Sequence, residues 1–307
     1  MPALKYNMVT ILGATASGKT AVASHLAKSL GGEIISADSR QVYRGMDIGT
    51  GKDLSDYIIE GTLVPYHLID IADAGYQYNV FEFQRDFLKV YNSMQNRKKF
   101  PVLCGGTGLY IEAVLKGYKL IQVPVNETRR KELQKMSLEE LTSILSRYKE
   151  LHNTSDIENK KRAVRAIEIE EYYQLHPEID LSFPEINSLI IGIKFDRDSR
   201  RRRITQRLKD RLENGMIEEV EKLLSTGLTP ESLTYYGLEY KYLTMYVTGE
   251  ISYDEMFQSL NTAIHQFSKR QMTWFRKMER EGFKIHWLDG YIPLPEKIER
   301  IKQWLQP

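Results

Sequence analysis

The stretch GATASGKT, residues 13–20, decides the fold of this 307-residue chain. It fits the pattern G-x-x-x-x-G-K-[ST] in full, and it follows a short apolar run, residues 8–12, that is typical of a buried strand. A helix is expected over residues 19–30, because Gly31 and Gly32 follow as end signals. Strand, loop and helix in this order predict a phosphate-binding loop made of Gly13, Ala14, Thr15, Ala16, Ser17, Gly18, Lys19 and Thr20.

Two side chains of this loop are expected to act on a diphosphate or triphosphate. Lys19 supplies a formal positive charge to the terminal phosphates, and Thr20 offers its hydroxyl to Mg²⁺. The alternative is a strand–turn–helix corner that binds nothing. The loop does not decide the reaction, because kinases and NTPases hold ATP or GTP in such a loop, and an enzyme that expels diphosphate could use the same cradle.

Alternating strands and helices extend the pattern along the chain. A helix is expected over residues 80–96, where apolar residues recur at helical spacing. Long helices are expected after residue 195. Five further strands are expected, at residues 33–37, 66–71, 101–104, 188–195 and 282–287. The alternation predicts an α/β fold, with a mostly parallel sheet flanked by helices.

One part of the chain breaks the alternation. Between residues 125 and 175 no strand pattern occurs. Three amphipathic helices are expected instead, at residues 127–135, 138–151 and 160–174. We therefore predict an inserted all-helical subdomain, residues 125–185, within a catalytic core made of residues 1–124 and 186–307.

Polar residues follow two of the expected strands. Asp38 and Ser39 come after the strand at 33–37, and Thr107 follows the strand that ends at Cys104. Because strand carboxyl ends face the ligand crevice in open parallel sheets, these side chains are expected to point toward the phosphate loop. Asp38 could accept a proton or hold Mg²⁺ through water, or it could merely form a turn or helix cap. Thr107 has the same alternative of a helix cap, and Cys104 is expected to be a buried core thiol.

Three basic stretches are candidates for anion binding. Arg200, Arg203, Arg207 and Arg211 share one face of an expected helix, which favours phosphate binding over a solvated face. Residues 269–277 interleave cations with Trp274 and Phe275. This pattern suits either a nucleic-acid strand or two core aromatics between solvated cations. The third stretch lies in the helical insertion and contains Lys160, Lys161, Arg162 and Arg165.

The composition limits the class of protein. The net charge of +2 does not imply a general coat of nucleic acid, although a local basic face is compatible with it. With one cysteine no disulfide can form within the chain, which suits a reducing cytoplasm. The start of the chain shows no signal-peptide pattern, and no run of 18 apolar residues occurs, so no membrane association is expected.

Six motifs together resemble a known family. GATASGKT is followed, in this order, by IISADSRQVYRGMDIGTGK, YHLIDI, CGGTGLYIEAVLKG, KRAVRAIEI and KRQMTWFR. This set resembles the bacterial tRNA dimethylallyltransferases, also called tRNA isopentenyltransferases, and it covers residues 12–276. The first two motifs in tandem are highly specific, whereas the central helical part matches weakly.

The resemblance implies a fold and a reaction. The fold would be a P-loop kinase-like core with a helical insertion that helps to hold the anticodon arm of tRNA. The reaction would transfer a dimethylallyl group from dimethylallyl diphosphate to N6 of adenosine 37, in tRNAs that read codons beginning with U. It would use Mg²⁺ and release diphosphate. The enzyme is expected to be a cytoplasmic monomer that binds the tRNA anticodon stem-loop.

The resemblance also implies roles for single residues. Residues 13–20 would bind the diphosphate, Asp38 would be the general base toward the adenine amino group, and Thr107 would contact the target nucleotide. Arg203 or Arg197 would help to hold the diphosphate. Contacts with tRNA are implied for Asp38, Ser39, Arg40, Gln41, Thr107, Arg129, Lys161, Arg162, Ala163, Val164, Arg165, Lys269, Arg270, Gln271, Trp274 and Arg276.

Some positions depart from the family pattern. Ala14 stands where proline is usual, Arg200 replaces an apolar residue, and Ile264-His265 replaces Thr-Arg. Residues 236–240 read YGLEY in place of a more typical IGYK, and residues 145–160 lack the customary pattern. The residues that carry the chemistry remain, so these departures bear on the choice and affinity of tRNAs rather than on the reaction.

Three other functions remain open on the residues alone. One is a small-molecule or nucleoside kinase that uses ATP, with the arginine helix as a lid. Another is transfer of the same allylic group to free AMP or ADP, which would not need the helical insertion or the stretch at 269–276. The last is a non-enzymatic RNA-binding protein, against which the intact Lys19, Thr20 and Asp38 argue.

Overall fold

Two compact units make up the chain in its computed structural model, which describes residues 5–149, 151, 154–178 and 182–306. One unit combines Met1–Tyr118 with Pro184–Pro307, and the other is Lys119–Phe183. The helical insertion was expected at 125–185, a few residues from the bounds of the second unit. In the part of the chain that the structure describes, no helix is both long and apolar enough to cross a membrane.

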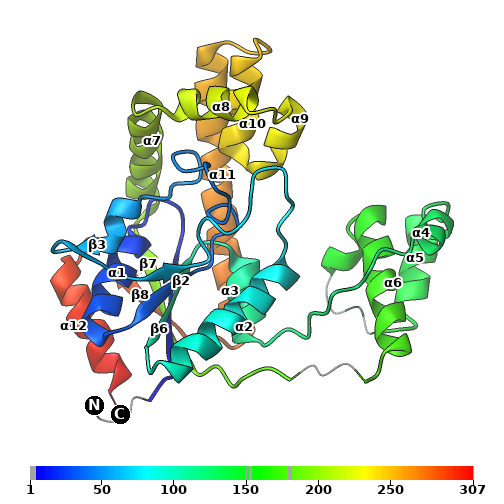
Figure 1. Cartoon of the computed structure of the whole chain (residues 1–307), viewed down its shortest axis with the longest axis horizontal. Helices are drawn as coiled ribbons and strands as arrows, with labels where there is room; N and C mark the ends of the chain where they lie inside the picture. The colour runs from blue at the N-terminus through cyan, green and yellow to red at the C-terminus, as the bar shows by residue number, and fades with distance from the viewer. Residues whose placement is uncertain (1–4, 150, 152–153, 179–181, 307) are drawn as a thin grey trace. The chain divides into compact units, whose positions relative to one another are not determined.

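A six-stranded sheet forms the centre of the first unit (Figure 1). The strand order is β5-β2-β6-β1-β7-β8, and each pair of neighbours is parallel. The strands are β1 (Met8–Gly13), β2 (Glu33–Ser36), β5 (Tyr66–His67), β6 (Pro101–Gly105), β7 (Ser188–Lys194) and β8 (Ile285–Asp289). The predicted α/β fold with a parallel sheet flanked by helices is therefore confirmed.

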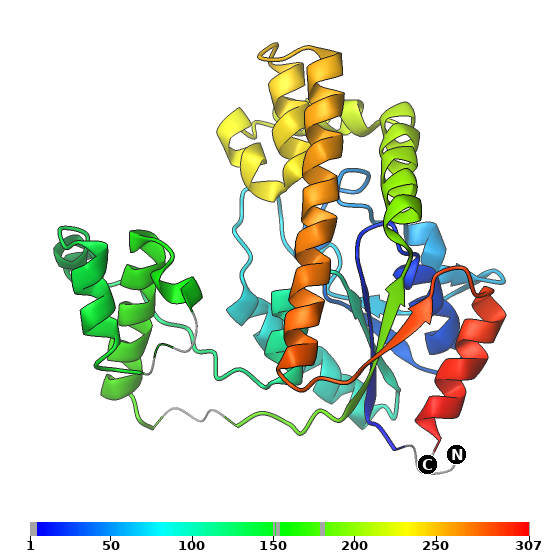
Figure 2. The same cartoon turned by 180° about the vertical axis from the view of Figure 1, so that it is seen from behind.

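Helices cover both faces of this sheet. Figures 1 and 2 show α1 (Lys19–Leu30) and α12 (Leu294–Leu305) on one face, and α2 (Val80–Asn96) and α3 (Gly108–Leu115) on the other. The expected bounds of α1 and α2 are confirmed. Apolar side chains of α1 and α12 pack on the strands in one core cluster, so the sheet is a fixed base for the loops at its carboxyl edge.

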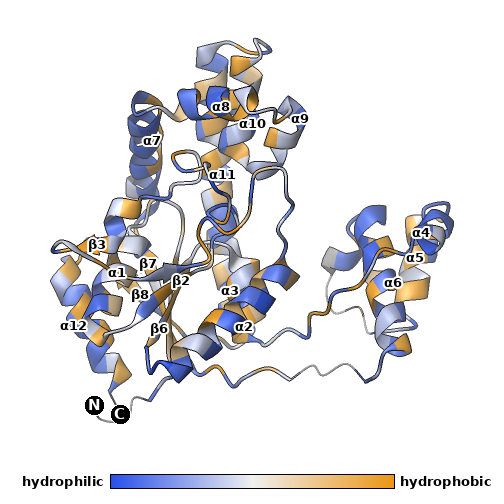
Figure 3. Ribbon diagram, in the orientation of Figure 1, coloured by the Kyte–Doolittle hydropathy of each residue, from blue (hydrophilic) through white to orange (hydrophobic). Residues whose placement is uncertain are grey.

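Five helices occupy the chain between β7 and β8, as expected. They are α7 (Arg197–Glu213), α8 (Met216–Ser225), α9 (Pro230–Leu233), α10 (Leu238–Val247) and α11 (Tyr253–Arg280). Helix α11 is 28 residues long, and a capping box of Ser252 and Glu255 starts it. Figure 3 shows mostly hydrophilic residues along α7, in contrast to the strands of the sheet.

The second unit is helical and has its own core. It contains α4 (Glu127–Leu133), α5 (Leu138–Leu145) and α6 (Lys160–Leu175), and α5 ends earlier than the expected 151. The buried side chains that these helices share are Leu133, Leu141, Leu145, Ala163, Val164, Ala166 and Ile167. Short 3-10 helices lie at Thr154–Ile157 in this unit and at Leu54–Tyr57 and Thr234–Tyr236 in the first unit.

Two expected strands differ from the structure, and one hairpin was not expected. The strand expected at 66–71 pairs only over two residues, because Leu68 and Asp70 have positive φ angles of 62° and 54° that end the extended backbone. The last strand lies at 285–289 rather than 282–287, because Gly282 at φ 97° forms the turn after α11. A short antiparallel hairpin of β3 (Ile58–Ile59) and β4 (Thr62–Leu63) was not predicted.

Candidate active site

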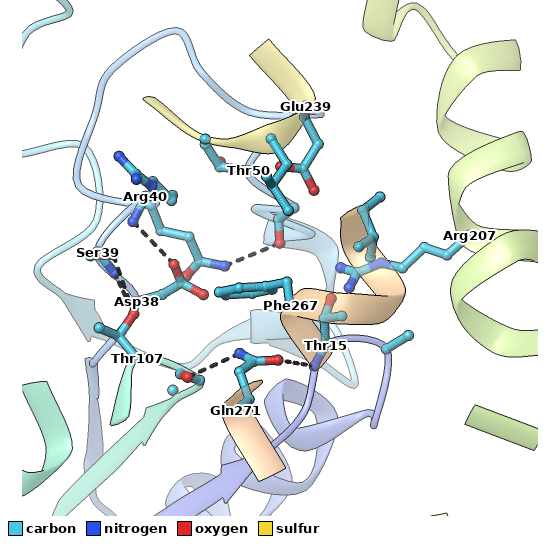
Figure 4. Close-up of a pocket in the computed structure, with 18 of the residues that line it drawn as sticks. Thr15, Asp38, Ser39, Arg40, Thr50, Thr107, Arg207, Glu239, Phe267 and Gln271 are labelled. Atoms are coloured by element: carbon cyan, nitrogen blue, oxygen red, sulfur yellow. Dashed lines mark hydrogen bonds between the residues drawn. The ribbon is translucent and has the colours of Figure 1, made fainter. Parts of the chain in front are cut away.

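A cavity of about 870 Å³ lies in the first unit, at the carboxyl edge of the sheet (Figure 4). The phosphate loop, the residues after β2 and the residues after β6 form its floor. Side chains of α7, α10 and α11, which come much later in the sequence, complete its lining. The cavity thus collects the loop, Asp38 and Thr107 in one place, as the strand order requires.

The phosphate loop is shaped by its backbone. Ala16 and Gly18 have φ angles of 61° and 76°, which turn the chain before α1 begins at Lys19. A Cβ atom at Gly13 would lie 2.6 Å from Ser17 Oγ and 2.9 Å from the main-chain oxygen of Ile193, so glycine is needed there. No acidic residue lies in the first turn of α1 to oppose a bound anion.

Lys19 lines the floor of the cavity. Burial lowers the pKa of Lys19, and the nearby Cys104 and Asp38 act against this shift. Arg207 and Arg211 lower the pKa further by repulsion, so three cations converge on this floor. Such a group is stabilised when an anion binds among its members. Diphosphate binding by this loop stays a prediction, and the three cations that line the cavity are compatible with it.

Asp38 lies two residues after the end of β2 and is half-buried in the cavity lining. Its Oδ1 accepts a hydrogen bond from the Arg40 main-chain N–H at 3.1 Å, which makes the turn that the residue type favours. Oδ2 accepts no hydrogen bond from the described residues. Asp38 therefore forms a turn with one oxygen and leaves the other for a ligand, so the two alternatives are compatible.

Thr107 precedes α3 but does not cap it with its side chain. Its Oγ1 accepts from the Ser39 main-chain N–H at 3.0 Å and donates to Ser39 Oγ at 3.3 Å. The helix-cap alternative is therefore wrong for this side chain. The hydrogen bonds join the loops after β2 and β6, so Thr107 and Asp38 are held at adjacent places in the cavity (Figure 4).

The two residues after Ser39 make contacts within the protein. Arg40 Nη1 donates to the main-chain oxygen of Tyr235 at 2.7 Å. The Gln41 amide accepts from Ser36 Oγ at 3.1 Å and donates to the main-chain oxygen of Gly51 at 3.1 Å. Gln41 thus positions the loop that follows β2. Their expected contacts with tRNA stay predictions.

The arginine face of α7 divides into two groups. Arg203, Arg207 and Arg211 line the cavity, whereas Arg197 and Arg200 lie outside its lining. Arg203 Nε donates to the main-chain oxygen of Ala16 in the phosphate loop at 2.9 Å. This contact makes Arg203 the better placed of the two arginines expected to hold the diphosphate.

Arg211 is the most buried arginine of this group. Burial and the neighbouring Arg207 lower the pKa of Arg211 to about 10, and its buried Nη2 has no hydrogen-bond partner among the described residues. Arg207 forms an ion pair with Asp53 at the cavity wall. Arg211 Nη2 also lies 3.7 Å from the same Asp53 carboxylate, so two guanidinium groups share one carboxylate, and an anionic ligand would balance the remaining positive charge.

Gln271 joins α11 to two loops of the site. Its side-chain oxygen accepts from the Thr15 main-chain N–H at 2.9 Å, and its side-chain nitrogen donates to the main-chain oxygen of Gly106 at 2.9 Å. Gln271 is buried, so both polar groups of the amide are used within the protein. Its expected contact with tRNA stays a prediction, and its observed role is to position the two loops.

Replacing Gln271 with alanine is expected to lower the free energy of unfolding by about 1–3 kcal/mol, because the main-chain groups of Thr15 and Gly106 lose their partners. Urea unfolding of the variant measures this change. Gln266→Ala is the control, since Gln266 is exposed on the same helix. Equal stabilities of the two variants would contradict the assigned role.

The aromatic pair on α11 is divided between core and cavity. Phe275 is fully buried, as the core alternative expects. Trp274 is half-buried in the cavity lining, and its indole packs so closely on Gly108 that a Cβ atom there would lie 2.3 Å from it. Lys269 and Arg276 are exposed, and Arg270 lies at the cavity lining. The core alternative thus holds for Phe275, whereas contact of Trp274 with a nucleic-acid strand stays a prediction.

Residues of the second unit that were expected to contact tRNA differ in their surroundings. Ala163 and Val164 are buried in the core of that unit. The prediction that their side chains contact tRNA is therefore wrong. Arg129 pairs with Glu171 at 2.6 Å, and Arg165 donates to the main-chain oxygen of Val123 at 2.9 Å. Lys161 is exposed, and the exposed Arg162 forms an ion pair with Glu158.

The sequence did not identify several residues of the cavity. Asp53, Asp56, Glu239 and Phe267 lie in its lining. Burial raises the pKa of Glu239, and burial together with Asp53 raises the pKa of Asp56. None of the four follows a strand of the sheet, so no sequence pattern signals them. Within the described residues, no cluster of three or more histidine, cysteine or acidic side chains could hold a metal.

Comparisons with known proteins give a consistent result. The model of the family described as IPP transferase matches residues 41–278, and that described as isopentenyl transferase matches residues 6–66. The chain is 62% identical to tRNA dimethylallyltransferase 2 of Bacteroides fragilis over 98% of each chain. It is 60% identical to tRNA dimethylallyltransferase 1 of Parabacteroides distasonis over 95% of each chain.

Solved structures agree with the sequence relatives. The tRNA isopentenylpyrophosphate transferase of Bacillus halodurans superposes with a TM-score of 0.72 at 33% identity, covering 98% of this chain and 95% of that one. A eukaryotic dimethylallyltransferase acting on tRNA superposes with a TM-score of 0.75 at 20% identity, covering 97% of this chain and 75% of that one. The second similarity shows the shared fold alone.

Proposed function

Because this chain belongs to the IPP transferase family of tRNA dimethylallyltransferases, we propose that it transfers a dimethylallyl group from dimethylallyl diphosphate to N6 of adenosine 37 in tRNAs that read codons beginning with U. One observation carries the proposal beyond the family assignment. The phosphate loop, Asp38 and Thr107 line a single cavity, so a diphosphate and an acceptor amine can meet there.

The proposed reaction exchanges one bond for another. The carbon–oxygen bond to the diphosphate breaks, and its electron pair leaves with the oxygen. The lone pair of N6 forms the new carbon–nitrogen bond, and Asp38 takes the N6 proton through Oδ2, which accepts no hydrogen bond from the residues that the structure describes. Lys19 and Arg203 face the place where negative charge develops on the leaving diphosphate.

Oxygen ligands for a magnesium ion line the same cavity. They are the Thr20 hydroxyl and the Asp56 carboxylate, whereas the Asp53 carboxylate is paired with Arg207 and Arg211; hydroxyl, carboxylate and phosphate oxygens are the ligands that Mg²⁺ prefers. Thr20 and the diphosphate would hold the ion, which would supply further positive charge to the leaving group.

A transfer assay separates the proposed function from its alternatives. The protein is incubated with dimethylallyl diphosphate, labelled in the allyl group, and with unmodified tRNA, with AMP, or with no acceptor. Label is expected in tRNA, at adenosine 37. Label in the nucleotide would indicate a cytokinin-type enzyme, and absence of label in both products would contradict allyl transfer.

Binding of tRNA is expected to depend on Lys269 and Arg270, because Lys269 is exposed and Arg270 lies at the cavity lining on the same helix. Replacing both with alanine should weaken tRNA binding and reduce the slope of log K against log salt by about one unit per lost phosphate contact. Titrations of labelled tRNA at several salt concentrations measure the slope, and donor binding should not change.

The control variant changes Arg300 and Lys302 of α12 to alanine. These residues form surface ion pairs with Glu296 and Glu299 and lie outside the cavity lining. Their replacement removes the same charge without an expected loss of tRNA affinity. If the two double variants have the same salt slope as the unchanged protein, the stretch at 269–276 is a solvated face.

A further inference from the structure

Phe267 occupies an unusual place for an aromatic side chain. It lies on α11 and lines the cavity, and Figure 4 shows its ring between Asp38 on one side and Thr15 of the phosphate loop on the other. The residue is 39% exposed. Single exposed aromatics are ordinary on protein surfaces. This one lines the same cavity as the group that would accept the proton and the loop that would hold the diphosphate.

The position of this ring is fixed by the helix that carries it. Gln271, one turn further along α11, is hydrogen-bonded to both loops of the site. Ile264 and Trp274 line the cavity from the same side of the helix, since residues 264, 267, 271 and 274 recur at steps of three and four. Trp274 packs on Gly108. The helix therefore presents a fixed, mostly apolar stripe to the cavity.

The proposed reaction requires an environment that stabilises positive charge on the allyl group. When the bond to the diphosphate breaks, positive charge develops on the allyl carbons. A carboxylate or water next to these carbons could capture them in place of N6. The face of an aromatic ring attracts a cation and offers no nucleophilic atom, and the attraction strengthens when water is excluded.

We propose that Phe267 is a catalytic residue whose ring contacts the allyl group of the donor, stabilises the positive charge that develops there and shields it from water. The inference rests on the proposed function. It assigns the C–O bond cleavage to the space between the phosphate loop and Asp38, with the ring beside the reacting carbon. The proton still goes from N6 to Asp38, and the electron pair of the broken bond leaves with the diphosphate.

A second use of the same ring is stacking on an RNA base. The guanidinium carbon of Arg270 lies 6.0 Å from the centroid of the Phe267 ring, and arginine beside an aromatic ring is common where single-stranded RNA binds. The two uses predict different losses. A stacking platform contributes to tRNA affinity, whereas a ring beside the allyl group contributes to the rate of the bond-breaking step.

The test varies the electron density of the ring without changing its shape. Phenylalanine at 267 is replaced by its 4-fluoro, 3,5-difluoro and 3,4,5-trifluoro forms. Single-turnover transfer is measured with the donor saturating and with enzyme in excess over tRNA, at a concentration that binds all of the tRNA. The rate is expected to fall stepwise with each fluorine, by about tenfold to thirtyfold over the series. The dissociation constant of tRNA is expected to change less than twofold.

Two conventional variants accompany the series. In Phe267→Leu, which removes the π face, the rate should fall by a similar factor, and more than one diphosphate should be released per alkylated tRNA because water reaches the allyl group. Phe267→Tyr should retain most of the rate. Tyr253→Leu is the matched control, because Tyr253 is an exposed aromatic on α11 outside the cavity lining.

The outcomes separate the inference from the function on which it rests. Transfer by the unchanged protein, with equal single-turnover rates across the fluorinated series, would overturn the role of Phe267 alone. A loss confined to tRNA affinity would also overturn it, in favour of base stacking. No transfer to tRNA by the unchanged protein would instead contradict the proposed function.

Discussion

Replacing Asp38 with asparagine is expected to lower the single-turnover rate of dimethylallyl transfer by about 10²–10⁴-fold, the usual contribution of a positioned general base. Asparagine keeps the shape of the side chain, and its oxygen can still accept from the Arg40 main-chain N–H. The turn after β2 should therefore persist, and tRNA binding should change little. What is lost is the basic oxygen that faces the cavity.

Comparison of low and high Mg²⁺ concentrations distinguishes the three roles open to this residue. Recovery of much of the lost rate at high Mg²⁺ would indicate that Asp38 holds the metal through water. A rate equal to that of the unchanged protein would leave Asp38 as a turn-former only. Asp73→Asn is the control for loss of one negative charge, since Asp73 forms a surface ion pair with Arg44 away from the cavity lining.

Replacing Lys19 with alanine is expected to reduce transfer by at least about 10³-fold and to weaken diphosphate binding, because the phosphate loop loses its one formal positive charge. Lys19 lies at the start of α1 among groups that need an anion, so its loss acts on the leaving group directly. Single-turnover transfer and binding of inorganic diphosphate by calorimetry measure the two effects.

Lys28→Ala is the matched control for the same helix. Lys28 lies in the last turn of α1, pairs with Glu60 at 2.6 Å and does not line the cavity. A surface ion pair contributes little to stability, so this variant should transfer the allyl group normally. Near-normal transfer by Lys19→Ala would contradict the proposal that the diphosphate of the donor binds in this loop.

Local patterns in the sequence predicted the parts of the site that follow strands. Residues 13–20, Asp38 and Thr107 each come directly after a buried apolar run, and parallel strands bring such positions to one edge. Local patterns also gave α1 and α2 with their observed bounds, because glycine follows the first helix and apolar residues recur at helical spacing in the second.

Other parts of the site depend on contacts between distant segments. Gln271 accepts a hydrogen bond from Thr15, which lies 256 positions earlier in the sequence. No local pattern predicts that its amide connects two loops of the site. Phe267 reads as an ordinary apolar position on an amphipathic helix until the helix is placed over the sheet edge. Ala163 and Val164 show the opposite case. They lie in a basic stretch, but helical spacing places them in the core of their unit.

The two hydrogen bonds of Gln271 have a consequence for the affinity of the protein for its two ligands. A shift of helix α11 at Gln271 would break or carry along its hydrogen bonds to the phosphate loop and to the loop after β6. The residues expected to hold tRNA, Lys269 and Arg270, immediately precede Gln271. A donor that fixes the phosphate loop and an RNA that fixes α11 then favour the same arrangement. Thermodynamic reciprocity requires that each ligand raise the affinity for the other by an equal factor.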